Sequence, residues 1–368
     1  ARTAMLIGSE NFSNPEGAII ELVKNTYDAD SAYCYILFDC TDEQITDIYI
    51  IDYGCGMDIS TIQNCWMQIG TDDKQLNVQT ANGRIKSGAK GIGRFALNRL
   101  GSQAVMYTHK NGEDAYAWKV DWNDFNAPGK RINEIMADLE VVSLEEIRYS
   151  LSELAKRFNV SLPKFYSGTI LRISDLADKW GEESIKHLNS SLQDLVPPFN
   201  IPAFQQYLYV SGINEYGKIT AKQYEDFDYK VSAKYEDNIL KVDVQRNELD
   251  INALQSEYRG LFNQEAMKQF PYRLEDFEKE SYHIEMPLEG LDGLQKSKLL
   301  TEYSSKLGAF QFDFYFVKSS KSDISSEKSD AKYPYRHFSP THRRLWLRKN
   351  LGIKIYRDKF RVRPYGEN

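Results

Sequence analysis

The sequence predicts an α+β protein with two domains, the first of which spans residues 1–200. Residues 15–30 carry apolar side chains at helical spacing. Two runs directly after them, 33–39 and 45–51, are apolar, β-branched or aromatic, as is typical of strands. After Pro202 the pattern changes, and 368 residues exceed the usual size of a single domain.

The first helix, expected over residues 15–30, has a well-marked start. Asn14 is a good N-cap, Pro15 suits the first helical position, and Glu16 is favoured near the positive end of the helix dipole. A turn around 41–44 then separates the two strands that follow. The expected apolar stripe of the helix consists of Ala18, Ile19, Leu22 and Val23.

The rest of the first domain alternates between helical and strand-like segments. A polar, glycine-containing stretch at 71–90 is expected to be a mobile loop. The other elements expected before residue 201 are a helix at 60–69 with Ser60 as its cap, a helix at 91–100, a hairpin of 103–108 and 115–121 joined by Asn111-Gly112, a helix at 143–158, a strand at 169–173 and a helix at 182–196.

Residues 201–368 are expected to form a second domain that also mixes strands with helices. One strand, at 308–317, alternates strongly between apolar and polar residues, so we expect one of its faces to be buried. The other expected elements are strands at 207–212, 229–234 and 239–244, a flexible Ser- and charge-rich loop near 319–332, a helix at 339–351 and a strand at 353–362.

The charge is mildly acidic overall but unevenly distributed. A net charge of −7 argues against a protein that coats nucleic acid with its whole surface. Residues 332–363, however, contain eleven Lys and Arg and one acidic residue, Asp358. Two interpretations stay open: a solvated basic face, or a surface that binds the phosphate groups of a nucleotide or of nucleic acid.

Cysteine usage and hydropathy narrow the class of protein further. The four cysteines form no CxxC pair and have no neighbouring histidine, so they indicate neither a zinc site nor a disulfide framework. No run approaches the roughly 18–20 apolar residues that span a membrane, and no signal peptide is visible. We therefore expect a cytoplasmic protein. Because the chain begins at Ala1 without methionine and ends abruptly, we expect a fragment of a longer protein.

Three motifs carry the chemistry, and the first lies on the expected helix at 15–30. Glu21 and Asn25 are spaced i, i+4, and Asp28 continues the same face at i+7. A carboxylate can take a proton from water, and an amide oxygen is a suitable ligand for Mg²⁺. Alone, this pair is also common on solvated helix faces.

The second motif, Asp52-x-Gly54-x-Gly56-Met57, directly follows the strand at 45–51. A carboxylate at a strand end can accept a hydrogen bond from the amino group of adenine, whereas guanine offers an oxygen at that position. Glycines let the backbone turn tightly and approach the base. Taken alone, such a motif is most often only a turn.

The third motif is a glycine-rich segment, Gly88-Ala-Lys90-Gly91-Ile92-Gly93-Arg94, that leads into the helix expected at 91–100. Backbone N–H groups at the start of a helix form a cradle for phosphate. The segment lacks the Gly-Lys-Ser/Thr of a P-loop, and it does not occupy the first turn of a βαβ unit.

The order of these motifs between residues 21 and 94 is specific, although each alone is not. ELVKNTYDAD, DYGCGM and GAKGIGRFA resemble the N-box and the two glycine boxes of the GHKL superfamily, which includes gyrase B subunits, MutL proteins, the ninety-kilodalton heat-shock chaperones, histidine kinases and MORC ATPases. Gly168-Thr169 resembles its later Gly-Thr motif. The resemblance covers residues 8–175, and more loosely the whole chain resembles bacterial ATP-binding proteins known by their HATPase domain.

The resemblance implies a Bergerat-type α/β sandwich, with helices layered on a mixed sheet, that binds ATP and Mg²⁺. Glu21 would be the general base that activates water, and Asn25 would bind Mg²⁺. Asp52 would bind adenine, supported through water by Thr169. Asp28 would orient groups within the pocket. The pocket for the base would be lined by Gly54, Gly56 and Met57.

The same resemblance assigns phosphate binding to the glycine-rich segment and a transducer-like role to residues 201–368. Lys90 and Lys74 are each either phosphate ligands or solvated loop residues. A Lys or Arg of the transducer would reach the γ-phosphate; Lys354, Arg357 and Lys359 are candidates, as is the chain beyond residue 368. The backbone turn around the phosphates would be formed by Gly91, Ile92, Gly93 and Arg94.

Three functions stay open at this point. The first is a slow ATPase that acts as a molecular switch and forms a homodimer when ATP is bound. The second is phosphotransfer of the histidine-kinase type, and the third is a nucleotide-binding scaffold without turnover. The Glu21/Asn25 form of the N-box favours hydrolysis, and none of the five histidines lies in a helical segment before the pocket. The basic segment keeps nucleic acid among the candidate partners.

Overall fold

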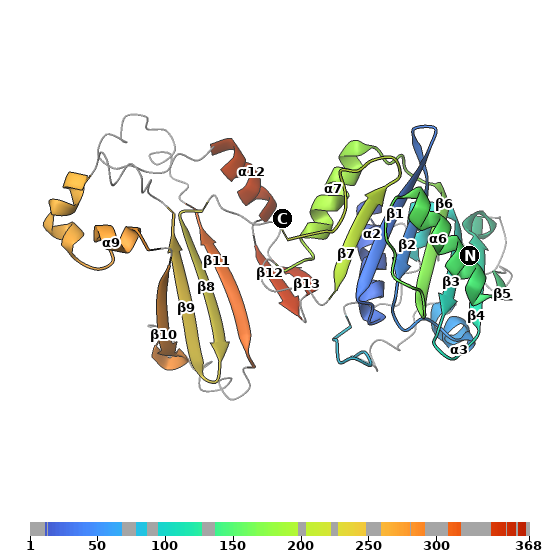
Figure 1. Cartoon of the computed structure of the whole chain (residues 1–368), viewed down its shortest axis with the longest axis horizontal. Coiled ribbons are helices and arrows are strands. Elements are labelled where there is room, and N and C mark those ends of the chain that lie inside the picture. The colour runs from blue at the N-terminus through green and yellow to red at the C-terminus, as the bar shows by residue number, and fades with distance from the viewer. Residues whose placement is uncertain are drawn as a thin grey trace. The chain divides into compact units, whose positions relative to one another are not determined.

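The computed structural model describes residues 12, 14–67, 79–86, 95–126, 137–197, 204–221, 227–247, 259–279, 281–290, 308–317, 340–350, 352–357 and 360–365. The chain divides into two compact units (Figure 1). The first unit comprises Ala1–Lys222 and Gly352–Glu367, and the second comprises Gln223–Leu351. Both contain helices and strands, which confirms the predicted α+β class.

A seven-stranded mixed sheet is the centre of the first unit, with the strand order β5-β4-β3-β6-β2-β1-β7. Neighbouring strands are antiparallel except for β1 and β7, which are parallel. The strands are β1 (Tyr33–Thr41), β2 (Gln44–Asp52), β3 (Gly101–His109), β4 (Ala115–Asp121), β5 (Asp138–Val142), β6 (Gly168–Leu176) and β7 (Gln205–Val210).

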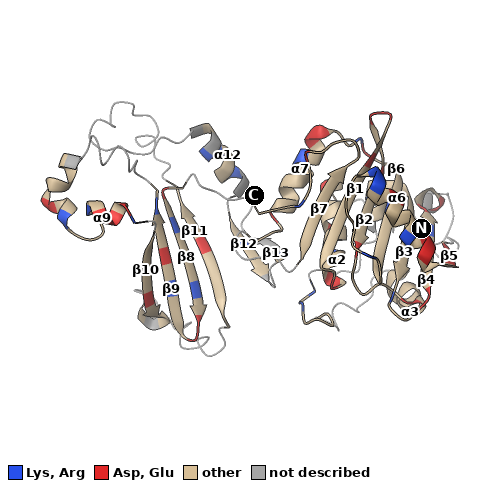
Figure 2. Cartoon of the chain, viewed as in Figure 1, with Lys and Arg blue, Asp and Glu red and all other residues tan. Residues whose placement is uncertain are grey.

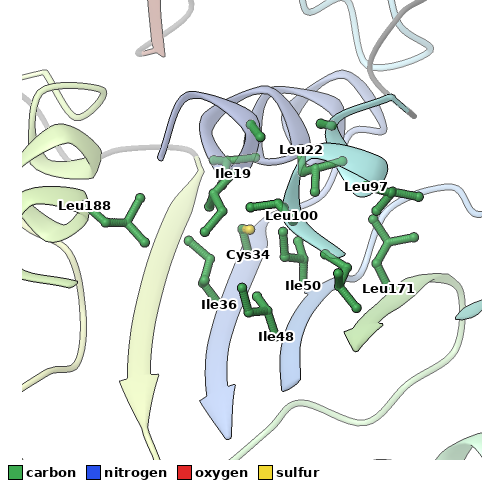
Figure 3. Packing of buried hydrophobic residues seen from close by; sticks show 14 of the residues in the cluster. Ile19, Leu22, Cys34, Ile36, Ile48, Ile50, Leu97, Leu100, Leu171 and Leu188 are labelled. Carbon is green, nitrogen blue, oxygen red and sulfur yellow. The ribbon is translucent and has the colours of Figure 1, made fainter. Parts of the chain in front are cut away.

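Helices cover both faces of this sheet. One face packs against α2 (Pro15–Asp28), α5 (Phe95–Leu100) and α7 (Glu182–Gln193), and the other against α6 (Leu144–Arg157). Because side chains alternate along a strand, β1 supplies both cores: Cys34, Ile36 and Phe38 enter the first, and Tyr35 and Leu37 the second. Figure 3 shows the first core, where α2 lies over the sheet.

The first helix forms as the sequence predicts. The Asn14 side chain caps α2 by accepting a hydrogen bond from the Gly17 amide at 2.7 Å, and Pro15 is the first helical residue. The predicted stripe of Ala18, Ile19, Leu22 and Val23 is buried. Ile19 and Leu22 face strand residues such as Ile36 and Ile50 across the core (Figure 3).

Several predicted elements differ from the structure. The strand expected at 308–317 is β11 (Phe310–Phe316), but neither of its faces is buried, because the side chains of Phe310, Phe312, Phe314 and Phe316 are all exposed. The helix expected at 60–69 is a short helix, α3 (Ile59–Thr61), followed by one π-helical segment, Ile62–Trp66. Its cap is Asp58, whose carboxylate accepts from the Thr61 amide at 2.7 Å, so Ser60 is not the cap. The strand expected at 353–362 is two antiparallel strands, Ile353–Arg357 and Phe360–Tyr365.

The expected boundary at residue 200 also differs from the division into units. β7 is part of the first sheet because it pairs in parallel with β1, far away in sequence. The strands β12 (Ile353–Arg357) and β13 (Phe360–Tyr365) form a hairpin that belongs to the first unit; we call it the return hairpin. The first unit is therefore discontinuous in sequence.

Aromatic stacking fixes the return hairpin in the first unit. Phe360 is 1% exposed and stacks on Tyr27 of α2, with ring centroids 4.4 Å apart and an interplanar angle of 14°. Phe204 meets both rings edge-on. The Arg361 amide donates to the Leu195 carbonyl, and the Tyr356 hydroxyl donates to the Asp194 carbonyl.

A four-stranded antiparallel sheet, ordered β10-β9-β8-β11, forms the second unit. Its strands are β8 (Tyr229–Glu236), β9 (Ile239–Arg246), β10 (Tyr282–Pro287) and β11 (Phe310–Phe316). The α-helices in the described part of this unit are α9 (Leu274–Phe277) and α12 (Pro340–Asn350). Arg343 of α12 donates to buried Asp228 at 3.1 Å, and Trp346 contacts Tyr315.

Charged side chains follow the helix dipoles. α6 and α7 each begin with two acidic residues, and α6 ends with two basic ones (Figure 2). Among the helices described, none combines the length and the apolar character needed to cross a membrane. The Ser- and charge-rich loop expected near 319–332 lies outside the described residues.

Substituting Phe360→Ala tests the return hairpin. Because Phe360 is buried against Tyr27, we expect a loss of about 3–5 kcal/mol in the stability of the first unit. Urea unfolding followed by tryptophan fluorescence measures this loss, since Trp66, Trp118, Trp122 and Trp180 all lie there. Phe312→Ala, at a position 43% exposed, is the control and should leave that transition unchanged; equal effects would contradict the prediction.

Candidate functional site

The first motif lies on one face of α2. Glu21, Asn25 and Asp28 are partly exposed, whereas Leu22 and Tyr27, on the opposite face, are buried in the core. The helix therefore holds a carboxylate, a carboxamide and a second carboxylate in a row, one turn apart. This face can present an acceptor for a proton and an oxygen ligand for a cation to the same bound molecule.

A lysine that the motif itself did not single out lies beside Glu21. The Lys24 ammonium is 2.5 Å from the Glu21 carboxylate, one turn along the helix. Both side chains are partly exposed, 23% for Lys24 and 34% for Glu21, so water screens the pair. A ligand that brings negative charge to this face can therefore compete with Glu21 for Lys24.

Asp52, the last residue of β2, is a buried carboxylate that is 5% exposed. Its Oδ1 accepts hydrogen bonds from the backbone amides of Gly54, at 2.8 Å, and Thr169, at 3.2 Å. Among the described residues, none donates to Oδ2. Burial raises the pKa of Asp52 to about 7, and the two amide bonds oppose that rise.

The loop after Asp52 needs glycine at two positions for steric reasons. A Cβ at Gly54 would lie 2.3 Å from the Ala29 carbonyl oxygen, so only glycine lets the loop reach the end of α2. Gly56 has a positive φ of 64°, and a Cβ there would lie 1.9 Å from the His109 carbonyl oxygen. The spacing of the two glycines thus reflects close backbone packing on both sides.

Thr108 of β3 connects the Asp52–Met57 motif with the Gly168-Thr169 motif. It was not predicted from the sequence. Its Oγ1 accepts from the Met57 amide at 3.0 Å and donates to the Gly168 carbonyl at 3.1 Å. The same oxygen lies 3.2 Å from Thr169 Oγ1. A threonine in a strand is so ordinary that no local pattern distinguishes it.

Backbone contacts attach this loop to the C-terminal end of α2. The Cys55 amide donates to the Ala29 carbonyl at 2.9 Å, and the Tyr53 amide donates to the Ser31 hydroxyl at 2.8 Å. On its other side the loop is held by Ser167, whose hydroxyl donates to the Gly54 carbonyl. The structure therefore brings Asp52, Gly54, Gly56, Met57 and Thr169 together beside the helix that carries Glu21.

The remaining predicted residues are the candidate phosphate ligands. Lys354 is described, and its ammonium lies 3.3 Å from the Asp194 carboxylate. The side chains of Arg357 and Lys359 lie outside the described residues. The same holds for Lys74 and for the predicted phosphate segment, Lys90, Gly91, Ile92, Gly93 and Arg94.

The protein side chains at this site could bind Mg²⁺ only if a bound phosphate supplied further oxygen ligands. Within the described ranges, no group of three or more His, Cys, Asp or Glu side chains could hold a metal ion. Asn25 offers one partly exposed carboxamide. In phosphate sites Mg²⁺ commonly uses one or two protein ligands, with phosphate oxygens and water completing its shell, and Asn25 suits that arrangement.

Comparison with known proteins agrees with this geometry. Residues 12–152 match the family described as histidine kinase-, DNA gyrase B- and HSP90-like ATPase, which confirms the GHKL resemblance over that part of the chain. A protein of Herpetosiphon aurantiacus, named as a candidate type II restriction enzyme, HgiDII, is 31% identical over 101 residues. That alignment covers 27% of this chain and 16% of the relative, so the chain matches a small part of that protein's length.

Replacing Gly56 with alanine tests the close packing of the loop. Alanine at a positive φ costs about 1 kcal/mol, and the contact with the His109 carbonyl adds to that cost, so we expect a total above about 2 kcal/mol. Gly112→Ala is the matched control, because its φ is also positive, at 86°, and no atom lies within 4 Å of its added Cβ. Urea unfolding compares the two variants, and equal losses of stability would refute the steric argument.

Proposed function

We propose that the chain, whose residues 12–152 match the family of GHKL-type ATPases, is an ATP-gated switch that binds ATP and hydrolyses it slowly. The observation that carries the proposal is the buried Asp52 carboxylate. Its Oδ1 is held by two backbone amides, and its loop is attached to the helix of Glu21 and Asn25. This arrangement combines a carboxylate that can bind adenine with side chains suited to activating water and to binding the Mg²⁺ of a phosphate group.

In this proposal Asp52 selects adenine. With Oδ1 fixed by the Gly54 and Thr169 amides, Oδ2 can accept a hydrogen bond from the exocyclic amino group of the base. A buried carboxylate that gains a donor loses part of the free-energy cost of its burial. Guanine would bring an oxygen to the same place and would be repelled.

Glu21 would act as the general base for hydrolysis, and Asn25 would hold Mg²⁺ against the phosphates. Bound Mg²⁺ would neutralise phosphate charge. Glu21 would take the proton of the attacking water, and Asp28, one turn beyond Asn25, would orient groups within the pocket. Lys24 would then exchange its partner, since phosphate charge competes with Glu21 for its ammonium.

Nucleotide binding would be converted into conformational change by dimerisation and by the second unit. We propose that two protomers associate when ATP is bound, and that the second unit acts as a transducer. Two chain connections join the units, because the chain leaves the first unit after Lys222 and returns to it at Gly352. A change in either unit can therefore be passed on through both connections.

We also propose nucleic acid as a partner of this protein. One relative is named as a candidate restriction enzyme, although the similarity covers only 16% of it. Within the second unit, α12 carries three arginines and no acidic residue, and Arg344 and Arg348 lie exposed at i, i+4 spacing. Arg343 is engaged by Asp228 instead.

The pKa of Asp52 predicts how ATP binding depends on pH. The carboxyl is half protonated near pH 7 in the free protein, and adenine favours the ionised form, so binding should release protons at and below pH 7. We expect the affinity for ATP to fall up to tenfold per pH unit below 7. Calorimetry in buffers of different ionisation enthalpy measures the proton release.

Asp52→Asn should abolish the proton release that comes from the Asp52 carboxyl. It should leave the proton release that comes from the nucleotide's own phosphates. Asp39→Asn is the control, because Asp39 is also a buried carboxyl with a raised pKa but lies at the other end of β1 and β2. An unchanged pH dependence in the Asp52 variant would contradict the adenine contact.

Glu21→Gln tests hydrolysis. The amide keeps the size of the side chain but cannot take a proton, so we expect phosphate release to fall about 100-fold or more while ATP affinity changes little. Glu16→Gln, in the first turn of the same helix, is the control. An unchanged rate would show that Glu21 is not the base. Transfer of labelled phosphate to a histidine would favour the kinase alternative, and binding without any turnover would favour a scaffold.

A further inference from the structure

We infer that Asp30 and Arg84 are positioning residues that hold residues 79–86 against the end of α2 and so place the chain that leads into Gly88–Arg94. We call their contacts the Asp30–Arg84 clasp. The inference rests on the proposed function, because it concerns how the phosphate end of an ATP site is held. Arg84 belongs to none of the motifs that the resemblance identifies. Asp30 is the last residue of the ELVKNTYDAD segment, but the resemblance assigns it no role.

Asp30 is the acceptor of the clasp. It lies two residues after the end of α2 and has a left-handed φ of 61°. Its Oδ1 accepts from the Thr80 hydroxyl at 2.6 Å, and its Oδ2 accepts from the Asn82 amide at 3.0 Å. Both oxygens are therefore used to bind one short segment, and the side chain is only 11% exposed.

Arg84 completes the clasp from the other side. Its guanidinium donates to the carbonyl of Tyr27, in the last turn of α2, at 3.2 Å. It also donates to the carbonyl of Ser31, three residues after the end of that helix, at 2.8 Å. A cation at this end of a helix is favoured by the dipole. Its Nε lies 3.8 Å from Asp30 Oδ1, and the guanidinium lies over the Tyr27 ring, 4.9 Å from the centroid.

The segment held in this way is itself a closed turn. The Thr80 amide donates to the Arg84 carbonyl at 2.8 Å, the Arg84 amide donates to the Thr80 hydroxyl at 3.0 Å, and Gln79 and Ile85 form a bridge. A closed turn moves as one piece, so anchoring it at Asp30 fixes where Lys86 leaves it. Only residue 87 lies between that point and Gly88.

The end of α2 thus contacts both sides of the proposed site. The carbonyl of Ala29 and the hydroxyl of Ser31 bind the loop after Asp52, and Asp30 binds the turn at 79–86. The clasp therefore sets the distance between the loop after Asp52 and Lys86, the last described residue before the predicted phosphate segment. Its loss should weaken contacts to phosphate and spare contacts to adenine.

The test compares ATP with adenosine in the full chain. Asp30→Asn keeps a residue that tolerates a left-handed φ but removes the charge and one of the two acceptor oxygens. We expect affinity for ATP with Mg²⁺ to fall roughly tenfold, with adenosine affinity unchanged within about twofold, measured by calorimetry or competition. Asp42→Asn, in the β1–β2 turn with a φ of 50°, is the matched control and should change neither value.

Thr80→Val provides a second test that leaves Asp30 in place. It removes the hydroxyl that binds Asp30 and should produce the same split between ATP and adenosine, whereas Thr80→Ser should restore wild-type binding. If both Asp30→Asn and Thr80→Val bind ATP as the wild type does, or lose ATP and adenosine equally, the inference is overturned. If the wild type itself binds no ATP, the proposed function fails instead, which the wild-type titration shows directly.

Discussion

The proposed nucleotide site depends on one interaction, in which two backbone amides bind the buried Asp52 carboxylate. A carboxylate at this depth carries a desolvation cost, which is visible in its raised pKa. The Gly54 amide can reach it only because the loop turns back directly after the strand, and the Thr169 amide only because β6 pairs with β2. The surrounding backbone thus fixes one carboxylate oxygen and leaves the other for a ligand.

The C-terminal end of α2 is a second point on which several parts of the first unit depend. Within five residues, Tyr27 stacks on the return hairpin, Ala29 and Ser31 bind the loop after Asp52, and Asp30 binds the turn at 79–86. The helix that would carry the base and the metal ligand is therefore anchored where it ends. A disturbance there would reach several parts of the first unit at once, because their contacts share one short backbone segment.

Local features were predictable from the sequence, and long-range ones were not. The cap at Asn14, the apolar stripe of α2 and the hairpin joined at Asn111-Gly112 follow from neighbouring residues, so pattern alone identifies them. Thr108 and Arg84 act on residues more than fifty positions away, and neither has an unusual neighbourhood. The cap of α3 was misplaced by two residues because Asp58 and Ser60 are equally good caps by type. The parallel pairing of β7 with β1 had no local signal either.

The return hairpin also bears on how the chain is made. During synthesis the N-terminal part of a protein leaves the ribosome first and usually begins to fold at once. Here, the core around Tyr27 lacks Phe360 until the whole second unit has been translated, a delay on the order of ten seconds. The second unit is in effect an insertion within the first. The aromatic cluster around Tyr27 therefore stays incomplete while that insertion is being synthesised.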